Sequence, residues 1–417
     1  YNDDAWPYTK NAQTTGNPAA ALAHKDDRAN AGSFVGNIEA DYKIHGFEDL
    51  HIHANFGADY SYGKQKTIMS VYSYDNHYFG WDGWSDMSKY NLQFSAYAQY
   101  GHDWVDANQH FDVMVGYENQ YFYRKTQSDG SGFYQSTNKD PELAGQPYNR
   151  YTNTYITDNA LQSVYGRINW NGWDQVLVTA TFRADASSRF AKFNSKGQNA
   201  RWGLFPSVAI GWKIKETFLK DVHAINDLKL RVGYGITGQQ EGVGEYTYFK
   251  SYTVNREHAF YPIFGSDDTG ITSRPNAYNL GLTWEKTTTW NAGLDFGALN
   301  GRFNASVDFY YRKTKDLLQN VTVSAGTNFK NSVMTNVGEL SNTGVEFSMG
   351  GKVIQKKDFT WDLQYNVTWN KNKILSMTTG DRPGYYIPAG GISQGTGNTI
   401  QGQAEGHPAY SFLVYQQ

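Results

Sequence analysis

The chain has 417 residues, no cysteine and a formal net charge of −3 at pH 7. The lack of cysteine excludes disulfide scaffolds, thiolate metal centres and cysteine nucleophiles within this chain, and the small negative charge argues against nucleic-acid binding through phosphate contacts. Aromatic residues nevertheless make up 16% of the sequence, although its mean hydropathy of −0.65 is polar. Strands with one lipid-facing and one watery side produce that combination, whereas no stretch of about 18 apolar residues is present to form a membrane-spanning helix.

The first predicted strands have the period of two that places alternate side chains on opposite faces of a sheet. In residues 34–43, Phe34, Ile38 and Tyr42 alternate with polar neighbours, and residues 50–62 repeat the pattern after a short turn. Two such strands joined by a tight turn predict a hairpin. The same alternation predicts ten further strands and the start of a thirteenth, over residues 90–101, 111–123, 161–170, 176–185, 205–214, 228–237, 287–296, 302–312, 343–350, 359–370 and, for the thirteenth, 410–415.

The connections between these strands alternate between short and long along the chain. Loops above about 12 residues are uncommon in soluble domains, whereas outer-membrane barrels have short periplasmic turns and long extracellular loops. The sequence therefore predicts an all-β fold, a transmembrane antiparallel β-barrel that begins with an extracellular loop at 1–30. Short turns are expected near 45–49, 103–109, 171–175, 298–301 and 354–358, a helical turn in 215–227, and long connections at 63–89, 124–159, 186–203, 238–284, 313–342 and 371–409.

Strand parity also bears on the extent of the domain. Bacterial single-chain barrels close with an even number of strands, which leaves no free edge in the bilayer. A chain that begins in a loop and stops within a thirteenth strand is therefore expected to be an internal stretch of a longer polypeptide, with residues 1–417 forming part of one barrel.

One long connection is rich in aromatic and acidic side chains. Aromatic rings stack on apolar C–H surfaces, and carboxylates accept hydrogen bonds from hydroxyls, so this composition suits sugar rings. An equally weighted interpretation is that the aromatic residues pack the loop against its neighbours. The candidate substrate-binding residues are Tyr78, Phe79, Trp81, Asp82, Trp84 and Asp86. The 238–284 connection poses the same choice, with a partner protein as a third interpretation, through Tyr246, Tyr248, Phe249, Tyr252, Phe260 and Tyr261.

Catalytic and cofactor signals are weak. Gly233, Gly235 and Gly238 match a dinucleotide-binding spacing, but the helix that would hold the pyrophosphate is not predicted after them. His51 and His53 share one face of a strand, yet no third metal ligand is fixed by spacing. No serine nucleophile elbow is present. We therefore expect no enzyme activity, no cofactor and no metal site.

Several aromatic residues lie on outward faces near strand ends, where aromatic girdles meet the membrane interface. We expect a structural role for these residues, which are Tyr42, Tyr60, Tyr62, Tyr90, Tyr121, Tyr123, Tyr311 and Trp369.

Six stretches resemble one family, the SusC-like branch of the TonB-dependent outer-membrane transporters of Bacteroidetes. They occur in the right order and extend over about half of the chain. The stretches are FRADASSRF at 182–190, RWGLFPSVAIGW at 201–212, DLKLRVGYGITGQQ at 227–240, LTWEKTTT at 282–289, YYRKTKDLL at 310–318 and NVGEL at 336–340.

The resemblance implies a 22-stranded barrel in the bacterial outer membrane, with an N-terminal plug domain and final strands that lie outside this chain. It implies energy from the TonB–ExbB–ExbD complex, acting through the plug, and a SusD-like surface lipoprotein as partner, with dimers of transporter–lipoprotein pairs as a further expectation. The cargo implied is an oligosaccharide. Oligopeptide import within the same family is the alternative, and a passive porin or adhesin is the alternative from another class.

Charged residues on the watery faces of the strands gain a role from this resemblance. Such groups can hold a plug through hydrogen-bonded ion pairs that break and reform during transport. A solvated lumen wall is the plainer alternative for each one. The candidate lumen or plug-contacting residues are Arg183, Asp185, Arg189, Arg231 and Glu346.

Overall fold

The computed structural model describes residues 18–71, 80–133, 145–254, 260–262, 269–271, 273–323, 330–377, 384–391 and 399–414. The chain divides into two compact units, one of residues 1–40, 54–95 and 119–160 and the other of residues 41–53, 96–118 and 161–417. Within the described part, no helix has the length and apolar character needed to cross a membrane. The fold is all-β, as the sequence predicts.

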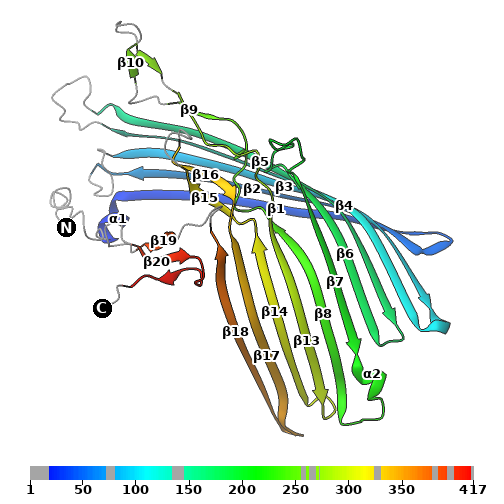
Figure 1. The fold of residues 1–417 in the computed structure, drawn as a ribbon. Helices are drawn as coiled ribbons and strands as arrows, with labels where there is room; N and C mark the ends of the chain where they lie inside the picture. The colour runs from blue at the N-terminus through cyan, green and yellow to red at the C-terminus, as the bar shows by residue number, and fades with distance from the viewer. Residues whose placement is uncertain are drawn as a thin grey trace. The chain divides into compact units, whose positions relative to one another are not determined.

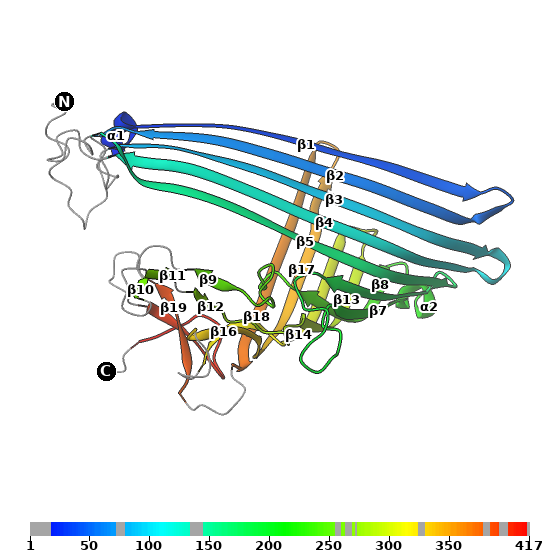
Figure 2. The same cartoon turned by 90° about the horizontal axis from the view of Figure 1, so that it is seen from above.

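Twelve strands form one sheet in the order β1-β2-β3-β4-β5-β6-β7-β8-β13-β14-β17-β18. The first five are the long strands that lie side by side in Figure 2. They follow a short helix α1 (Pro18–His24), and a single 3₁₀ turn η2 (Val105–Ala107) joins two of them. Their bounds are β1 Lys25–Ile44, β2 Phe47–Met69, β3 Trp81–Trp104, β4 Gln109–Phe133 and β5 Pro147–Gly172.

The remaining seven strands of this sheet belong to the second unit, and Figure 1 shows β13, β14, β17 and β18 running side by side. The helix α2 (Ile214–Phe218) follows β7 and is the helical turn expected in 215–227. The bounds are β6 Val176–Ser187, β7 Trp202–Lys213, β8 Ile225–Gln239, β13 Glu285–Ala298, β14 Phe303–Lys315, β17 Glu339–Lys356 and β18 Phe359–Ser376.

Short hairpin turns fix the register between neighbouring strands. Leu299 and Asn300 adopt positive φ angles of 57° and 54°, and Gly301 follows with 76°, so three left-handed residues reverse the chain between β13 and β14. The strands then pair without a bulge from Ala298 opposite Phe303 to Lys286 opposite Lys315. Because the register is regular, alternate side chains share one face of the sheet.

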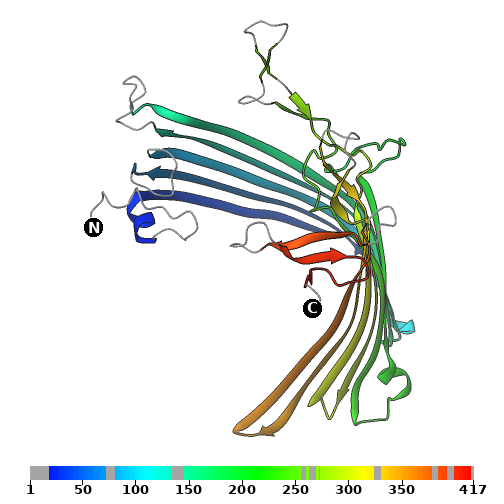
Figure 3. The same ribbon diagram turned by 60° about the vertical axis from the view of Figure 1, so that its left-hand side comes forward.

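All twelve complete strands predicted from the sequence are confirmed, whereas the described part of the thirteenth, 410–414, does not join their sheet. Ser411–Phe412 forms β21, which pairs with Gln401 and Gly402 in a separate three-stranded sheet. Tyr410 has a φ of +58°, which interrupts the extended conformation that a long strand requires. Figure 3 shows this small sheet near the end of β18, where Ile374 N donates to His407 O at 2.9 Å.

Two predicted long loops are largely strand. β2 and β3 extend to Met69 and from Trp81, and β4 and β5 extend to Phe133 and from Pro147, so 63–89 and 124–159 shrink to much shorter connections. In these extensions the apolar–polar alternation fades. The strands nevertheless stay paired, with cross-strand polar contacts such as that between Gln65 and Asp27. The loop expected at 1–30 likewise contains α1 and the start of β1.

The remaining long connections carry short two- and three-stranded sheets. Their members are β9 Tyr252–Val254, β10 Phe260–Pro262, β11 Thr269–Ile271, β12 Ser273–Pro275, β15 Leu318–Thr322, β16 Ser332–Asn336, β19 Tyr386–Gly391 and β20 Thr399–Ala404, together with β21.

The main buried cluster lies in the second unit, where these connections meet the ends of β7, β8 and β13. Phe190, Phe205, Val243, Leu282 and Trp284 form it. Trp284 Nε1 donates to Arg201 O at 2.8 Å, so its one polar atom is satisfied. The cluster ties the family-like stretches at 182–190, 201–212 and 282–289 together.

Candidate functional site

One face of the sheet is apolar and exposed. In the second unit it carries Val307, Phe309, Leu363 and Trp369, all more than 40% exposed. An apolar face of this kind needs lipid or another apolar surface against it.

Aromatic residues gather near the ends of the strands on this face. In the first unit, the Tyr90 ring stacks on Tyr123 with centroids 4.7 Å apart, and Tyr121 lies at 6.1 Å. In the second unit, the Trp212 ring packs edge-on against Phe218 at 5.6 Å. This is the arrangement expected of interfacial girdle residues.

The opposite face is polar and holds Arg183. Its Nε donates to Asp185 Oδ1 at 2.7 Å, and Nη2 donates to Glu118 Oε2 at 2.9 Å and to Ser163 Oγ at 2.8 Å. Strand register explains the set, because Ser163 pairs with Asp185 and Tyr165 with Arg183 across β5 and β6. The structure therefore brings two of the predicted residues, Arg183 and Asp185, into one hydrogen-bonded group.

The same face holds a second arginine set in the second unit. Arg231 Nε and Nη2 donate to the two oxygens of Asp295, both at 2.8 Å, and Nη2 also donates to Asp308 Oδ2 at 3.0 Å. Gly293 lies between these strands, opposite both Arg231 and Asp308, and a Cβ there would be 2.8 Å from Arg231 Nη2. A glycine is thus required for the ion pair to cross β13.

Glu346 lies beside this set. It pairs with Asp308 across β14 and β17 and is exposed. In the described part of the chain we observe no ion pair for it, so a carboxylate with no cation faces the carboxylate of Asp308. Cross-strand like charges are destabilising, and such a group is available to a cation from elsewhere.

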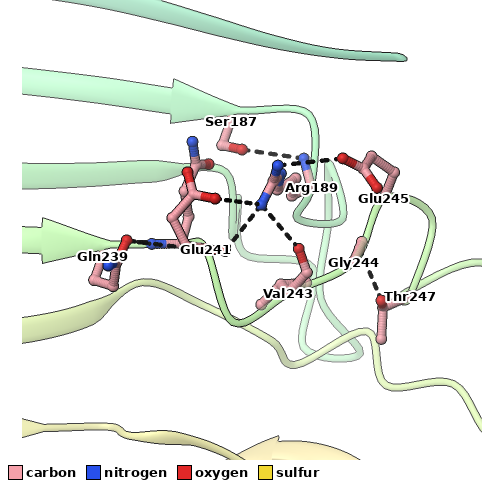
Figure 4. A network of polar contacts seen from close by, with 9 residues as sticks. Ser187, Arg189, Gln239, Glu241, Val243, Gly244, Glu245 and Thr247 are labelled. Carbon is pink, nitrogen blue, oxygen red and sulfur yellow. Dashed lines mark hydrogen bonds and ion pairs between the residues drawn. The ribbon is translucent and has the colours of Figure 1, made fainter. Parts of the chain in front are cut away.

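Arg189 has a different environment from the other two arginines (Figure 4). Its Nη1 donates to Val243 O at 3.1 Å and its Nη2 to Glu245 Oε1 at 3.2 Å, while Glu241 Oε2 lies 3.6 Å from Nη1. Only 13% of its side chain is exposed. This predicted lumen residue therefore ties the connection after β6 to the one after β8.

The candidate substrate residues at the start of β3 are separated by strand alternation. The Trp81 indole covers Gly83 and Gly130, since a Cβ at Gly83 would be 2.5 Å from Trp81 Nε1 and one at Gly130 would be 2.5 Å from Trp81 Cζ2. Trp84, 40% exposed, points to the other face.

Asp82 and Asp86 lie on the same face of β3 as Trp84, because residues two apart in a strand share a face. Asp82 lies 3.7 Å from Lys66 Nζ, and Asp86 lies 3.9 Å from Lys64 Nζ. Tyr78 and Phe79 lie outside the described residues. The six residues therefore do not form one cluster in the part that is described.

His51 and His53 both face Asp41, with Nδ1 3.6 and 3.5 Å from its two oxygens. Among the described residues, no three histidine or acidic side chains are arranged to hold a metal ion.

The acidic partners Glu118, Asp295 and Asp308 were missed by sequence reasoning. The short turn after β13 fixes which residues of β13 and β14 share a face, so Asp295 and Asp308 could have been placed together. Because a long connection separates β8 from β13, the sequence does not show which residues of β13 lie opposite Arg231.

Comparison with known proteins shows which family the chain belongs to. The family described as TonB dependent receptor-like, beta-barrel matches residues 1–403. The TonB-dependent receptor SusC of Bacteroides thetaiotaomicron is 49% identical over 100% of this chain and 40% of its own length. A TonB-dependent receptor of Formosa agariphila is 30% identical over 87% of this chain and 36% of its own.

Among solved structures, the RagAB peptide importer in its closed-closed state matches with a TM-score of 0.76 and 25% identity, over 94% of this chain and 40% of that chain. This chain therefore spans about two fifths of the length of the relatives it matches.

An antiparallel sheet with one exposed apolar face and one polar face bearing arginine–carboxylate sets defines a transmembrane barrel of the outer-membrane type. The chain belongs to the TonB-dependent receptor β-barrel family and is an outer-membrane protein. Its family consists of receptors rather than enzymes.

Proposed function

We propose that this chain is part of an active importer of oligosaccharides across the bacterial outer membrane. The observation that carries the proposal is 49% identity to SusC along the whole chain. The sequence resemblance set out above implies glycan cargo, and the polar face supplies hydrogen-bonding groups of the kind that sugar hydroxyls need.

The partners proposed follow the same resemblance. A plug domain and further strands complete the barrel, the plug receives energy from TonB–ExbB–ExbD, and a SusD-like lipoprotein assists capture, in dimers of transporter–lipoprotein pairs. Arg183, Asp185, Arg231 and Glu346 are proposed to contact the plug. For Arg189 we propose a structural role at the extracellular end of the barrel, because it donates to Val243 and Glu245 in the connection after β8.

For the substrate residues, we propose that Trp81 stacks on sugar from the polar face, which is the lumenal face of a barrel. The absence of a Cβ at Gly83 and Gly130 leaves room for the Trp81 ring. Tyr78 and Phe79 are retained in the proposal as neighbours in sequence, whereas Asp82, Trp84 and Asp86 serve as comparison positions on the other face.

The test is native mass spectrometry of the complex extracted from its own membrane. We expect a lipoprotein of lid size to co-purify, together with bound species whose masses form a ladder spaced by hexose or pentose. A barrel that carries neither would contradict the proposal and favour a porin or adhesin.

A second candidate is oligopeptide import. The observation that favours it is the match to RagAB, which is described as a peptide importer. Bound species spaced by amino-acid masses in the same experiment would select this candidate over glycans.

A further inference from the structure

A cavity of about 410 Å³ opens on the polar face of the second unit. It lies between the Arg231 set and the short turn that joins β13 to β14. Five neutral polar side chains line it, Asn304 and Ser306 from β14, Ser348 from β17, and Gln364 and Asn366 from β18. Register places Ser306, Ser348 and Asn366 in one row across these strands, and Asn304 and Gln364 in the next row with Gly350 between them.

The lining is rich in side chains that can both donate and accept hydrogen bonds. Within the described residues, none of the five side chains bonds to another part of the chain. Elsewhere on the same face, Arg183 and Arg231 donate to neighbouring acids, and Asn169 Nδ2 donates to Asp112 at 3.0 Å. Three amides and two hydroxyls therefore stand ready for a ligand that both donates and accepts.

The charged side chains of the lining indicate which kind of ligand can bind. Asp227 and Asp295 are its ionisable members, and it contains no cationic side chain. Arg231 already pairs with the Asp295 carboxylate, whereas Asp227 has no ion pair within the described residues, so its carboxylate accepts hydrogen bonds from hydroxyls and repels anions. The apolar residues beside the cavity, Phe296, Ala305 and Met349, alternate onto the other face of the sheet, so an apolar peptide side chain would find no apolar surface here.

Glycine creates the hollow. A Cβ on Gly350 would meet nothing closer than Gln364 Cγ at 3.7 Å. A larger side chain at this position is therefore free of clashes with the backbone, but it would fill the cavity. The volume lies within the range of small-molecule sites, about 300–1,000 Å³.

We infer that this cavity is a subsite for a neutral oligosaccharide on the import path. The inference rests on the proposed import of glycans and adds a location and a charge preference to it. Amide and hydroxyl groups of three adjacent strands bind the sugar hydroxyls, and the carboxylate of Asp227 disfavours uronate-containing chains.

The first experiment uses the full-length transporter with its partners in its own cells, and labelled neutral gluco-, xylo- and fructo-oligosaccharides of matched length. We expect Gly350→Leu, and separately the pair Gln364→Ala and Asn366→Ala, to lower the import rate about ten-fold at normal surface levels. Gly57→Leu is the control, because Gly57 lies on the polar face with its nearest neighbour, Gln93 Cβ, 3.9 Å from a Cβ. Wild-type rates in Gly350→Leu would overturn the subsite.

The second experiment uses the absence of cysteine in this chain. A Ser348→Cys variant should react with a small thiol reagent in energised cells, and an imported neutral oligosaccharide should slow that reaction at least three-fold, whereas an oligouronate of the same length should not. Equal protection by both, or a thiol that never reacts because polypeptide covers it, would overturn the inference. If wild type imports none of the neutral probes, the proposed function itself fails, whereas import that Gly350→Leu does not change removes only the subsite.

Discussion

Three arginines of the second unit, Arg183, Arg189 and Arg231, differ in what they bind. Arg231 reaches Asp308 across β13 because Gly293 leaves the space above that strand empty. Arg183 lies over the Tyr165 ring at 5.5 Å. Arg189 instead donates to backbone carbonyls, and its guanidinium therefore holds a connection rather than a neighbouring strand.

Replacing Arg231 tests the first of these sets. Arg231→Ala should destabilise the barrel by about 1–2 kcal/mol, because the half-buried carboxylates of Asp295 and Asp308 lose their shared cation. Thermal unfolding in detergent measures the effect. Arg231→Ala combined with Asp295→Asn and Asp308→Asn should recover part of the loss, and a triple variant less stable than the single one would contradict this account.

Gly238 tests the buried cluster at the same scale. A Cβ at this position would clash with Phe205 Cζ and lie 3.0 Å from Trp284 Cε3. Gly238→Ala should therefore cost about 1–3 kcal/mol, as overpacking of a filled core does, and should speed proteolysis of the connections around 188–201 and 240–251. Gly57→Ala, whose Cβ would lie no closer than 3.9 Å to a neighbouring side chain, is the control, and equal protease sensitivity of the two variants would refute the packing argument.

At the scale of the strand, alternation in β3 separates Trp81 from Trp84. Trp81→Ala should weaken oligosaccharide binding about five-fold, since one aromatic stacking contact is worth about 1 kcal/mol, whereas Trp84→Ala should leave affinity unchanged. Calorimetric titration of the purified complex with the cargo found by mass spectrometry measures both. A loss confined to Trp84→Ala would assign binding to the other face.

Strand positions were predictable because each membrane crossing alternates apolar and polar residues in a period of two. The ends of β2 to β5 were not, because beyond the bilayer both faces are polar and pairing is maintained by contacts such as Gln65 to Asp27 at 2.7 Å. The Arg183–Asp185 contact follows from their spacing along one strand. The Arg231 set joins strands separated by a long connection, so only the folded sheet reveals it.

For the whole molecule, the sheet has two environments that the sequence encodes residue by residue. Along β18, Trp361, Leu363, Val367 and Trp369 face one side, while Gln364 and Asn366 face the cavity side. A soluble protein would not leave such an apolar face exposed. The bilayer is therefore part of the fold, and side-chain direction should decide what a charge costs.

Two adjacent substitutions in β18 test that statement. Val367→Arg places a charge on the apolar face, where Val367 is 46% exposed, and should lower the free energy of unfolding from the bilayer into water by about 2–4 kcal/mol if the residue lies near the bilayer midplane. Thr368→Arg alternates onto the polar face, opposite Glu346 in β17, so its guanidinium meets a carboxylate and water and should cost less than about 1 kcal/mol. Denaturant titration of the full-length protein in vesicles compares them, and a larger loss in Thr368→Arg would reverse the assignment of the two faces.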